Sequence, residues 1–384
     1  MDFEFTEEQE MLRSTIRDWG KKEWPAKAVR ELDEKEEFPY EAWKQMGELG
    51  LLGACISEEH GGAGGGIIED VVIMEELARI MPSFALAYSM TVWAGLTFTR
   101  FGNEQQKKDY LPKITTGEIK FALGLTEPSG GTDVLSLSSF AELDGDDYVL
   151  HGQKMFTSLV QVSDYVLIVA RTVKDPPKRH HGLTVFIVDA KDPGLEVIPV
   201  HKLCNQVIDT NQLFYDGLRV NKNQVVGEVG NGWRVLVAFL NHERIGTGAL
   251  TLGLAEGAFE LALQYAKDRF AFGRPIGQFQ AIQCYLAEMA TGIEIMRLLT
   301  YKAAWLESRG ERCDVEAVMA KMFCSEEACK VATRGMDILG GYGVSMEYDM
   351  QRFFRDSRHF TFAPISNEMA RNYIAQSFGV PKSY

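Results

Sequence analysis

The sequence predicts an α+β fold with an N-terminal helical domain, a central domain built on a β-sheet or barrel, and a C-terminal four-helix bundle. Three observations support this prediction. Apolar residues recur at helical spacing up to about residue 118, short β-branched or aromatic runs occupy residues 119–230, and the helical period returns over residues 231–384. The chain has 384 residues, of which 46% are hydrophobic, so it is long enough to bury the cores of two or three domains.

The N-terminal domain, residues 1–118, is expected to be helical. Helical periodicity covers residues 7–23, 41–51, 66–80 and 85–101, with Gly-rich turns between them. The last of these stretches is largely apolar and contains Tyr88, Trp93 and Phe98, so we expect a buried helix there.

The central domain, residues 119–230, is expected to form strands. Runs rich in β-branched or aromatic residues, bounded by Gly, Asp or Pro, cover residues 121–125, 148–152, 165–170 and 183–188. Residues 174–181 contain two prolines and are typical of a turn or loop.

The C-terminal domain, residues 231–384, is again expected to be helical. The predicted helices cover residues 235–242, 246–268, 281–308 and 315–339. They are long and mostly apolar on one face, as in a helical bundle.

Charge and composition exclude several classes of protein. The net charge of −14 argues against general binding to a nucleic-acid backbone, which needs a basic face. No run of about 18 apolar residues is present, so we expect no membrane span, and the acidic start, Met1 to Phe5, lacks a signal-peptide core. The six cysteines are scattered without a CxxC pair, which predicts free thiols, a reducing cytoplasmic location and no metal site.

Two glycine-rich segments carry the strongest functional signal. One reads Asp-Ile-Leu-Gly-Gly-Tyr-Gly over residues 337–343, and the other reads Gly-Leu-Thr-Glu-Pro-Ser-Gly-Gly-Thr-Asp over residues 124–133. Glycine lets a backbone turn tightly and approach a ligand closely. Together and in this order, the pair resembles the two signature motifs of the acyl-CoA dehydrogenase family. The resemblance spans nearly the whole chain, from the turn at residues 58–62 to residues 366–368, and the order of helices and strands matches the family's three-domain layout.

The resemblance implies an FAD cofactor, whose reduced isoalloxazine ring needs hydrogen-bond donors. Hydroxyl and backbone donors would come from Leu125, Thr126, Gly131 and Thr132. Phe156 would pack on the flavin and Ser158 would bond to it, although many members have Trp where this chain has Phe156. Without the resemblance, the segment at residues 124–133 is merely a turn and Phe156 is a core aromatic.

The same resemblance implies a cofactor site shared between subunits. The guanidinium of Arg269 suits the pyrophosphate, because its planar fork matches phosphate oxygens. The other implied contacts are Phe272 and Gln280 beside it, Asp337, Gly340 and Gly341 at the adenosine end, and Ser366 and Glu368 next to that loop. A shared site requires an oligomer, and the family is typically a homotetramer.

The catalytic base is where this chain departs from many relatives. Desaturation of a thioester removes an α-proton, and a buried carboxylate with a raised pKa suits that task. Many members place a Glu before Gly-Thr near the C-terminus, but Pro364 stands at the matching position. A subset carries the base in an earlier Glu-Arg pair, which matches Glu243 and Arg244. We therefore predict Glu243 as the base; the alternative is an ordinary surface glutamate.

The implied substrate contacts lie on two helical segments. Asn241 and Arg244 match positions that contact the CoA portion. Some members that act on alicyclic thioesters carry an acid on the pocket helix, where this chain has Thr91, so we include Thr91 as a substrate contact. The nearby Tyr88, Met90 and Trp93 either shape a broad pocket or belong to a helical core.

These features predict an FAD-dependent acyl-CoA dehydrogenase that acts on a short, branched or alicyclic acyl-CoA and passes electrons to an electron-transfer flavoprotein. The C-terminal tail at residues 364–369 resembles the alicyclic subgroup, which favours cyclohexane- or cyclohexene-carboxyl-CoA. The same site run in reverse would make an enoyl-CoA reductase. Two other classes share the fold. One is a flavin monooxygenase or oxidase, whose reduced flavin would react with oxygen. The other is a non-catalytic homologue, in which Glu243→Gln would leave turnover unchanged.

Overall fold

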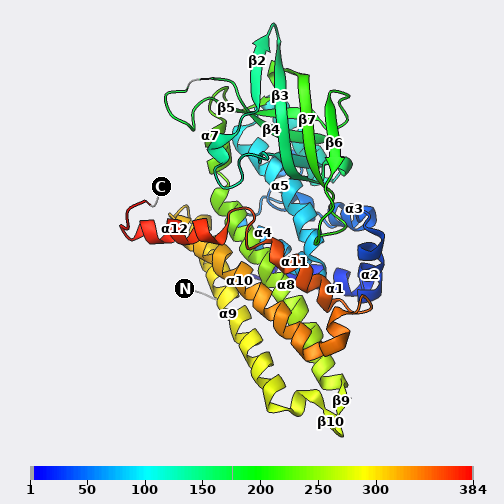
Figure 1. The fold of residues 1–384 in the computed structure, drawn as a ribbon. Helices are drawn as coiled ribbons and strands as arrows, with labels where there is room; N and C mark the ends of the chain where they lie inside the picture. The colour runs from blue at the N-terminus through cyan, green and yellow to red at the C-terminus, as the bar shows by residue number, and fades with distance from the viewer. Residues whose placement is uncertain (1–3, 175, 383–384) are drawn as a thin grey trace.

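The computed structural model describes residues 4–174 and 176–382. Figure 1 shows a β-sheet domain at one end, N-terminal helices beneath and beside it, and long C-terminal helices that run away from it. The predicted α+β class and the order of its parts are confirmed. The parts of the predictions that concern Met1–Phe3 and Asp175 lie outside the described residues.

The predicted N-terminal helices are present, and two further helices join them. Residues 7–23, 66–80 and 85–101 form α1 (Glu7–Glu23), α4 (Ile67–Ile80) and α5 (Pro82–Phe101). The stretch at 41–51 ends earlier than predicted, as α3 (Tyr40–Glu48) followed by a 3-10 turn at Leu51–Gly53. The sequence analysis missed α2 (Ala26–Lys35) and α6 (Glu104–Thr115), which are short and strongly charged; α6 also contains Pro112.

The central domain is a mixed sheet with the strand order β6-β7-β3-β2-β4-β5-β8, in which β1 pairs in parallel with β4. The predicted strands are β1 (Phe121–Gly124), β3 (Asp147–Ser158), β4 (Tyr165–Arg171) and β5 (Leu183–Asp189). The unpredicted strands are β2 (Phe140–Asp144), β6 (Leu195–Pro199), β7 (Thr210–Asn221) and β8 (Val225–Val226). Long pairing with β7 extends β3 well beyond the predicted run, so residues 153–158 belong to a strand.

The C-terminal domain is dominated by α8 (Leu240–Asp268), α9 (Gln280–Ser308) and α10 (Asp314–Leu339). A short hairpin, β9 (Phe270–Ala271) and β10 (Arg274–Pro275), joins α8 to α9 at the far end of the molecule from the sheet (Figure 1). Before them comes α7 (Gly232–Val237), and after them come α11 (Met350–His359) and α12 (Asn367–Ser377).

One predicted helix boundary in this domain was wrong. The predicted break near residues 243–245 does not exist, because α7 ends at Val237 and α8 runs without interruption from Leu240. Gly246 lies within this helix and allows close packing, because a Cβ added there would lie 2.9 Å from the ring of Trp93. The correction places Glu243 in the first turn of α8.

Two general features complete the description. Within residues 4–174 and 176–382, no helix combines the length and the apolar character that crossing a bilayer requires. All six cysteines are free thiols.

Candidate active site

Glu243 occupies the first turn of α8, where its backbone N–H donates to Phe239 O at 2.8 Å. Its side chain is half-buried, and no described residue donates a hydrogen bond to its carboxylate. Burial raises the pKa of Glu243 to about 7, even though the cations Arg244 and Lys321 act in the opposite direction. A carboxyl group that titrates near neutral pH and has no fixed partner is suited to take up a proton.

The two predicted CoA contacts lie on the same turn as Glu243. Asn241 Nδ2 donates to Asp314 Oδ1 at 3.1 Å, which ties this turn to the start of α10. Arg244 Nη1 donates to Asn241 Oδ1 at 3.4 Å, and its guanidinium lies 5.7 Å from the ring centre of Tyr373 on α12. The first turn of α8 is therefore held against both α10 and α12.

The segment from residue 361 to 366 connects α11 to α12 and carries Pro364, which is exposed. Ser366 caps α12, because its Oγ accepts from Met369 N–H at 3.3 Å. Glu368 is exposed in the first turn of that helix. Buried Asn367 accepts a hydrogen bond from Lys321 on α10, so this turn packs close to the start of the bundle.

The structure brings together the two segments that were predicted to hold the flavin. Met155 N–H donates to Thr126 O at 2.8 Å, which joins the glycine-rich loop to β3. Leu125 and Thr126 are half-buried, whereas Gly131 and Thr132 are exposed, and a Cβ added at Gly131 would meet nothing within 4 Å. The hydroxyls of Thr126, Thr132 and Ser158 bond to no other described residue, so they are available to a ligand.

Phe156 is held in a strained conformation on the same surface. Its φ is +59°, in the left-handed region that bulky residues rarely adopt, and its side chain is 62% exposed. Strain of this kind persists where the surrounding structure enforces it, and it is concentrated at functional sites. An exposed ring beside unpaired hydroxyls fits a flat, partly polar ligand such as a flavin.

A buried ion pair that the sequence analysis missed supports this surface. Lys154 Nζ lies 2.7 Å from Glu127 Oε1, and both side chains are almost fully buried. Burial would raise the pKa of Glu127, but Lys154 and hydrogen bonds from Ser138 and Ser139 lower it to about 2. The available signal was an acid inside the glycine-rich loop and a lysine inside a strand, yet neither residue indicates its partner.

Arg269 and the glycine-rich segment at residues 337–343 meet at the far end of the bundle. They line a depression of about 510 Å³ together with Tyr265, Ile276, Ile338, Leu339, Gly340, Gly341, Tyr342 and Ser345. Asp337 lies outside this lining and faces Arg334 at 3.5 Å. Phe272 is 95% exposed at the hairpin, and Gln280 is exposed at the first position of α9.

The structure does not bring all predicted cofactor residues together within one chain. Asn367 contacts Lys321, whereas Gly340 follows the end of α10; the 18 intervening helical residues span about 27 Å. Within a single chain, Ser366 and Glu368 therefore do not lie beside Gly340 and Gly341, and the prediction that they share one cofactor site depends on a neighbouring subunit. Phe156 belongs to β3 of the sheet domain, whereas Arg269 directly precedes β9 at the end of the bundle far from the sheet (Figure 1).

Thr91, a predicted substrate contact, makes a hydrogen bond within the protein. Its side chain is fully buried, and its Oγ1 accepts from Phe121 N–H at 3.2 Å, which joins α5 to β1. Tyr88 is also fully buried and donates to Asp70 Oδ1 at 2.8 Å, so it belongs to the core and not to a pocket wall. Only the half-buried Met90 and Trp93 of this group retain accessible surface.

A second buried network adjoins the predicted base. His242 Nε2 lies 3.0 Å from Asp70 Oδ2, and His242 Nδ1 lies 3.5 Å from Glu307 Oε1. Burial would lower the pKa of His242, but these two carboxylates raise it to about 9. The imidazolium thus links α8 to α4 and α9 one residue before Glu243.

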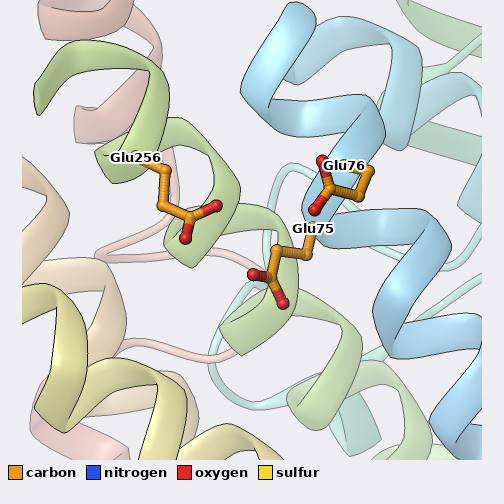
Figure 2. A group of neighbouring side chains, drawn as sticks. All are labelled: Glu75, Glu76 and Glu256. Carbon is orange, nitrogen blue, oxygen red and sulfur yellow. The ribbon is translucent and has the colours of Figure 1, made fainter. Parts of the chain in front are cut away.

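Figure 2 shows three neighbouring buried carboxylates, those of Glu75 and Glu76 on α4 and of Glu256 on α8. Arginines already surround them. Arg13, Arg17 and Arg79 pair with Glu76, and Arg297 pairs with Glu256 and lies 3.9 Å from Glu75. Tyr301 donates to Glu75 Oε2 at 2.6 Å. Because these charges are neutralised within the protein, the cluster is a structural junction between the N-terminal helices and the bundle.

Comparison with known proteins gives consistent results along the chain. The family models for the N-terminal, middle and C-terminal domains of acyl-CoA dehydrogenase match residues 6–118, 122–218 and 230–379. An acyl-CoA dehydrogenase from Bacillus subtilis is 37% identical, over 97% of this chain and 98% of that protein. The CarC subunit of the caffeyl-CoA reductase–Etf complex from Acetobacterium woodii is 36% identical, over 97% and 98% of the two chains.

A solved structure shows the same fold. The butyryl-CoA dehydrogenase from Megasphaera elsdenii superposes with a TM-score of 0.94 at 33% identity, covering 99% of this chain and 100% of that one.

Proposed function

Since the chain belongs to the acyl-CoA dehydrogenase family, we propose that it desaturates a short, branched or alicyclic acyl-CoA thioester with Glu243 as the base. The enzyme is an FAD-dependent oxidoreductase, as the family is. One observation carries the assignment of the base. Glu243 is a half-buried carboxylate with a pKa near 7 and no fixed partner, whereas the other family position holds Pro364.

In the proposed reaction, the substrate loses one proton from its α-carbon and one hydride from its β-carbon, and a double bond forms between them. Bound FAD supplies the hydride acceptor. The Glu243 carboxylate receives the proton; with a pKa near 7 it is partly ionised at neutral pH and still basic enough to act. Arg244 and Asn241 on the same turn are the proposed contacts for the CoA portion.

Two groups of residues are proposed to hold FAD. Phe156 and the free hydroxyls of Thr126, Thr132 and Ser158 suit the isoalloxazine ring. Arg269 and the glycine pair Gly340–Gly341 suit the pyrophosphate and adenosine end.

The distance between these two groups supports a shared cofactor site. Since the first group belongs to the sheet domain and the second lies at the end of the bundle far from the sheet, we propose that one copy supplies the first group and a neighbouring copy the second, in a homotetramer. The almost complete exposure of Phe272 beside the Arg269 depression agrees with contact to another copy.

A second candidate is the reverse reaction, reduction of an enoyl-CoA. It is favoured by the similarity to a subunit of a caffeyl-CoA reductase–Etf complex. Glu243 exchanges the same proton in both directions, so the site does not favour desaturation over reduction or the reverse. The same relative supports an electron-transfer flavoprotein as the redox partner.

Anaerobic absorbance of the purified flavoprotein tests this proposal. Straight, branched and alicyclic acyl-CoA thioesters, with cyclohexanecarboxyl-CoA among them, are added one at a time. We expect one class to bleach the flavin band. Bleaching by none of them, together with reoxidation of the chemically reduced flavin by an enoyl-CoA, would establish the reductase instead.

A further inference from the structure

The buried ion pair between Lys154 and Glu127 lies against the glycine-rich loop at residues 124–133. Lys154 extends from β3, and its Nζ donates to Glu127 Oε1 at 2.7 Å and to Leu125 O at 3.3 Å. Both charged side chains are almost fully buried. Burying an ammonium group and a carboxylate is costly, and the proposed reaction assigns no role to either of them.

The start of the loop is built onto two consecutive residues of β3. A Cβ added at Gly124 would lie only 3.3 Å from Lys154 Cγ, so the missing side chain leaves room for the lysine stem. Two residues further on, Thr126 O accepts from Met155 N–H at 2.8 Å. Residues 124–127 therefore follow the strand closely, with the Lys154 side chain enclosed between them.

The carboxylate of Glu127 ties the same loop to the residues that precede β2. Its Oε2 accepts from the Ser138 N–H at 2.6 Å and from Ser138 Oγ at 2.9 Å. Its Oε1 accepts from the Ser139 N–H at 3.0 Å as well as from Lys154. Both oxygens are thus occupied within the protein, so this carboxylate acts on the loop and not on a ligand.

These contacts fix the direction of the Thr126 backbone amide. In a trans peptide, the C=O of one residue and the N–H of the next point in opposite directions. Because Leu125 O faces Lys154 Nζ, the Thr126 N–H points away from the buried pair. No described residue accepts a hydrogen bond from this N–H, so it is free to donate to a ligand.

The strand that supplies Lys154 also supplies the exposed ring of Phe156. Residues two apart on a regular strand share a face. Here the register with β7 shifts between Lys154 and Thr157, and the left-handed φ of +59° at Phe156 breaks the alternation. Lys154 therefore enters the interior, whereas the Phe156 ring remains 62% exposed. Two residues of strand span about 7 Å, so the support of the loop and the proposed flavin surface are close together.

We propose that the Lys154–Glu127 pair is a positioning device for the flavin: it holds the glycine-rich loop so that the Thr126 N–H is directed at the isoalloxazine ring. This inference rests on the proposed flavin site around Phe156. Lys154 and Glu127 do not touch the cofactor themselves; they act through the loop. A donor that is fixed before the ligand arrives costs no reorganisation when it binds.

The double variant Lys154→Met/Glu127→Gln tests the proposal in the holoenzyme. It removes the donor to Leu125 O without leaving a lone buried charge, so it should remain folded. The dissociation constant of FAD should rise about tenfold, as for one lost hydrogen bond. The midpoint potential of the bound flavin should fall by about 30 mV, which is a further tenfold loss for the reduced ring in a two-electron couple. Lys174→Met/Glu142→Gln, which removes an exposed pair of the same domain, should leave both quantities at their wild-type values.

A purely structural role would not change the flavin potential. A folded double variant with the wild-type FAD dissociation constant and the wild-type potential would therefore overturn the proposal. Phe156→Ala, measured alongside, separates this failure from a failure of the proposed flavin site. If Phe156→Ala weakens FAD binding and the double variant does not, the site stands and the positioning role is wrong. If both variants bind FAD like wild type, the proposed site and the positioning role are both wrong.

Amide hydrogen exchange in the wild-type holoenzyme tests the proposal without relying on the double variant to fold. In protein labelled with isotopic threonine, the Thr126 amide signal is identified by its absence in Thr126→Ser. Since no described residue accepts from this N–H, its protection reports on the cofactor. The amide should exchange at least about tenfold more slowly than an unprotected one. Exchange at the rate of an unprotected amide would overturn the proposal.

Discussion

His242 Nε2 lies 3.0 Å from Asp70 Oδ2, and this buried contact joins the turn that carries Glu243 to helix α4. The two residues are 172 positions apart in the sequence. Tyr88 donates to the other oxygen of Asp70, so the carboxylate is held on both sides. The placement of the candidate base thus depends on packing between the N-terminal helices and the bundle.

The His242 contact should make stability depend on pH between about 6.5 and 9. The pKa of His242 is raised in the folded protein, so its contribution is complete below about 6.5 and is lost as pH rises through about 9. A shift of this size corresponds to about 3 kcal/mol. In Asp70→Asn, the free energy of unfolding from urea titrations should fall most at low pH. Asp18→Asn, at an exposed position on α1, serves as the control, and an equal loss at pH 6 and pH 10 would contradict the prediction.

The Lys154–Glu127 pair should be important for the stability of the central domain. Lys154→Met leaves the Glu127 carboxylate buried without its partner, which typically costs about 3–5 kcal/mol. The double variant Lys154→Met/Glu127→Gln removes both charges and should recover much of that loss. Lys174→Met, which breaks an exposed pair with Glu142, should cost little. Equal urea midpoints for Lys154→Met and Lys174→Met would disprove the structural role of the pair.

Glu75 should limit stability at high pH. Burial and the neighbouring Glu256 raise the pKa of Glu75 above its ordinary value, so its contribution is complete at low pH and is lost as pH rises. Glu75→Gln mimics the protonated form, so Tm should fall less between pH 6 and pH 9 than in wild type. Glu48→Gln, in an exposed pair with Lys44, is the control. A steeper alkaline decline in Glu75→Gln would refute the prediction.

Phe156 should contribute to flavin retention. Loss of an aromatic stacking partner costs about 1 kcal/mol, so Phe156→Ala should bind FAD about fivefold more weakly. Dissociation of FAD is followed by the rise in its fluorescence on release. Phe378→Ala, an exposed phenylalanine on α12's C-terminal side, should match wild type. Wild-type retention in Phe156→Ala would remove this residue from the proposed flavin site.

Most helices and the central strands could be predicted because their signals are local. Helical periodicity predicted α1 and the long C-terminal helices. The glycine-rich segments indicated the family, and Pro364 at the position where many members carry the base then pointed to Glu243. The boundary of α8 was misjudged; the helix runs through Gly246, where the ring of Trp93 on α5 packs closely against it. Strand β7 was missed because its register depends on pairing with β3.

The supporting polar residues of the site could not be predicted in the same way. Lys321 and His242 look like ordinary polar positions on helices, and their roles depend on partners brought close only by the fold. The bond from the Phe121 backbone to the Thr91 hydroxyl likewise depends on the contact between α5 and β1, which the sequence alone does not indicate.

The rate of anaerobic flavin reduction by the reacting acyl-CoA, compared between wild type and Glu243→Gln by stopped flow, tests the central assignment most directly. If Glu243 is the base, the rate should fall by roughly 10²–10⁴ while FAD remains bound. Glu260→Gln, a more exposed glutamate on the same helix that pairs with Arg79, should reduce the flavin at the wild-type rate. A wild-type rate in flavin-loaded Glu243→Gln would show that the proton goes to another group.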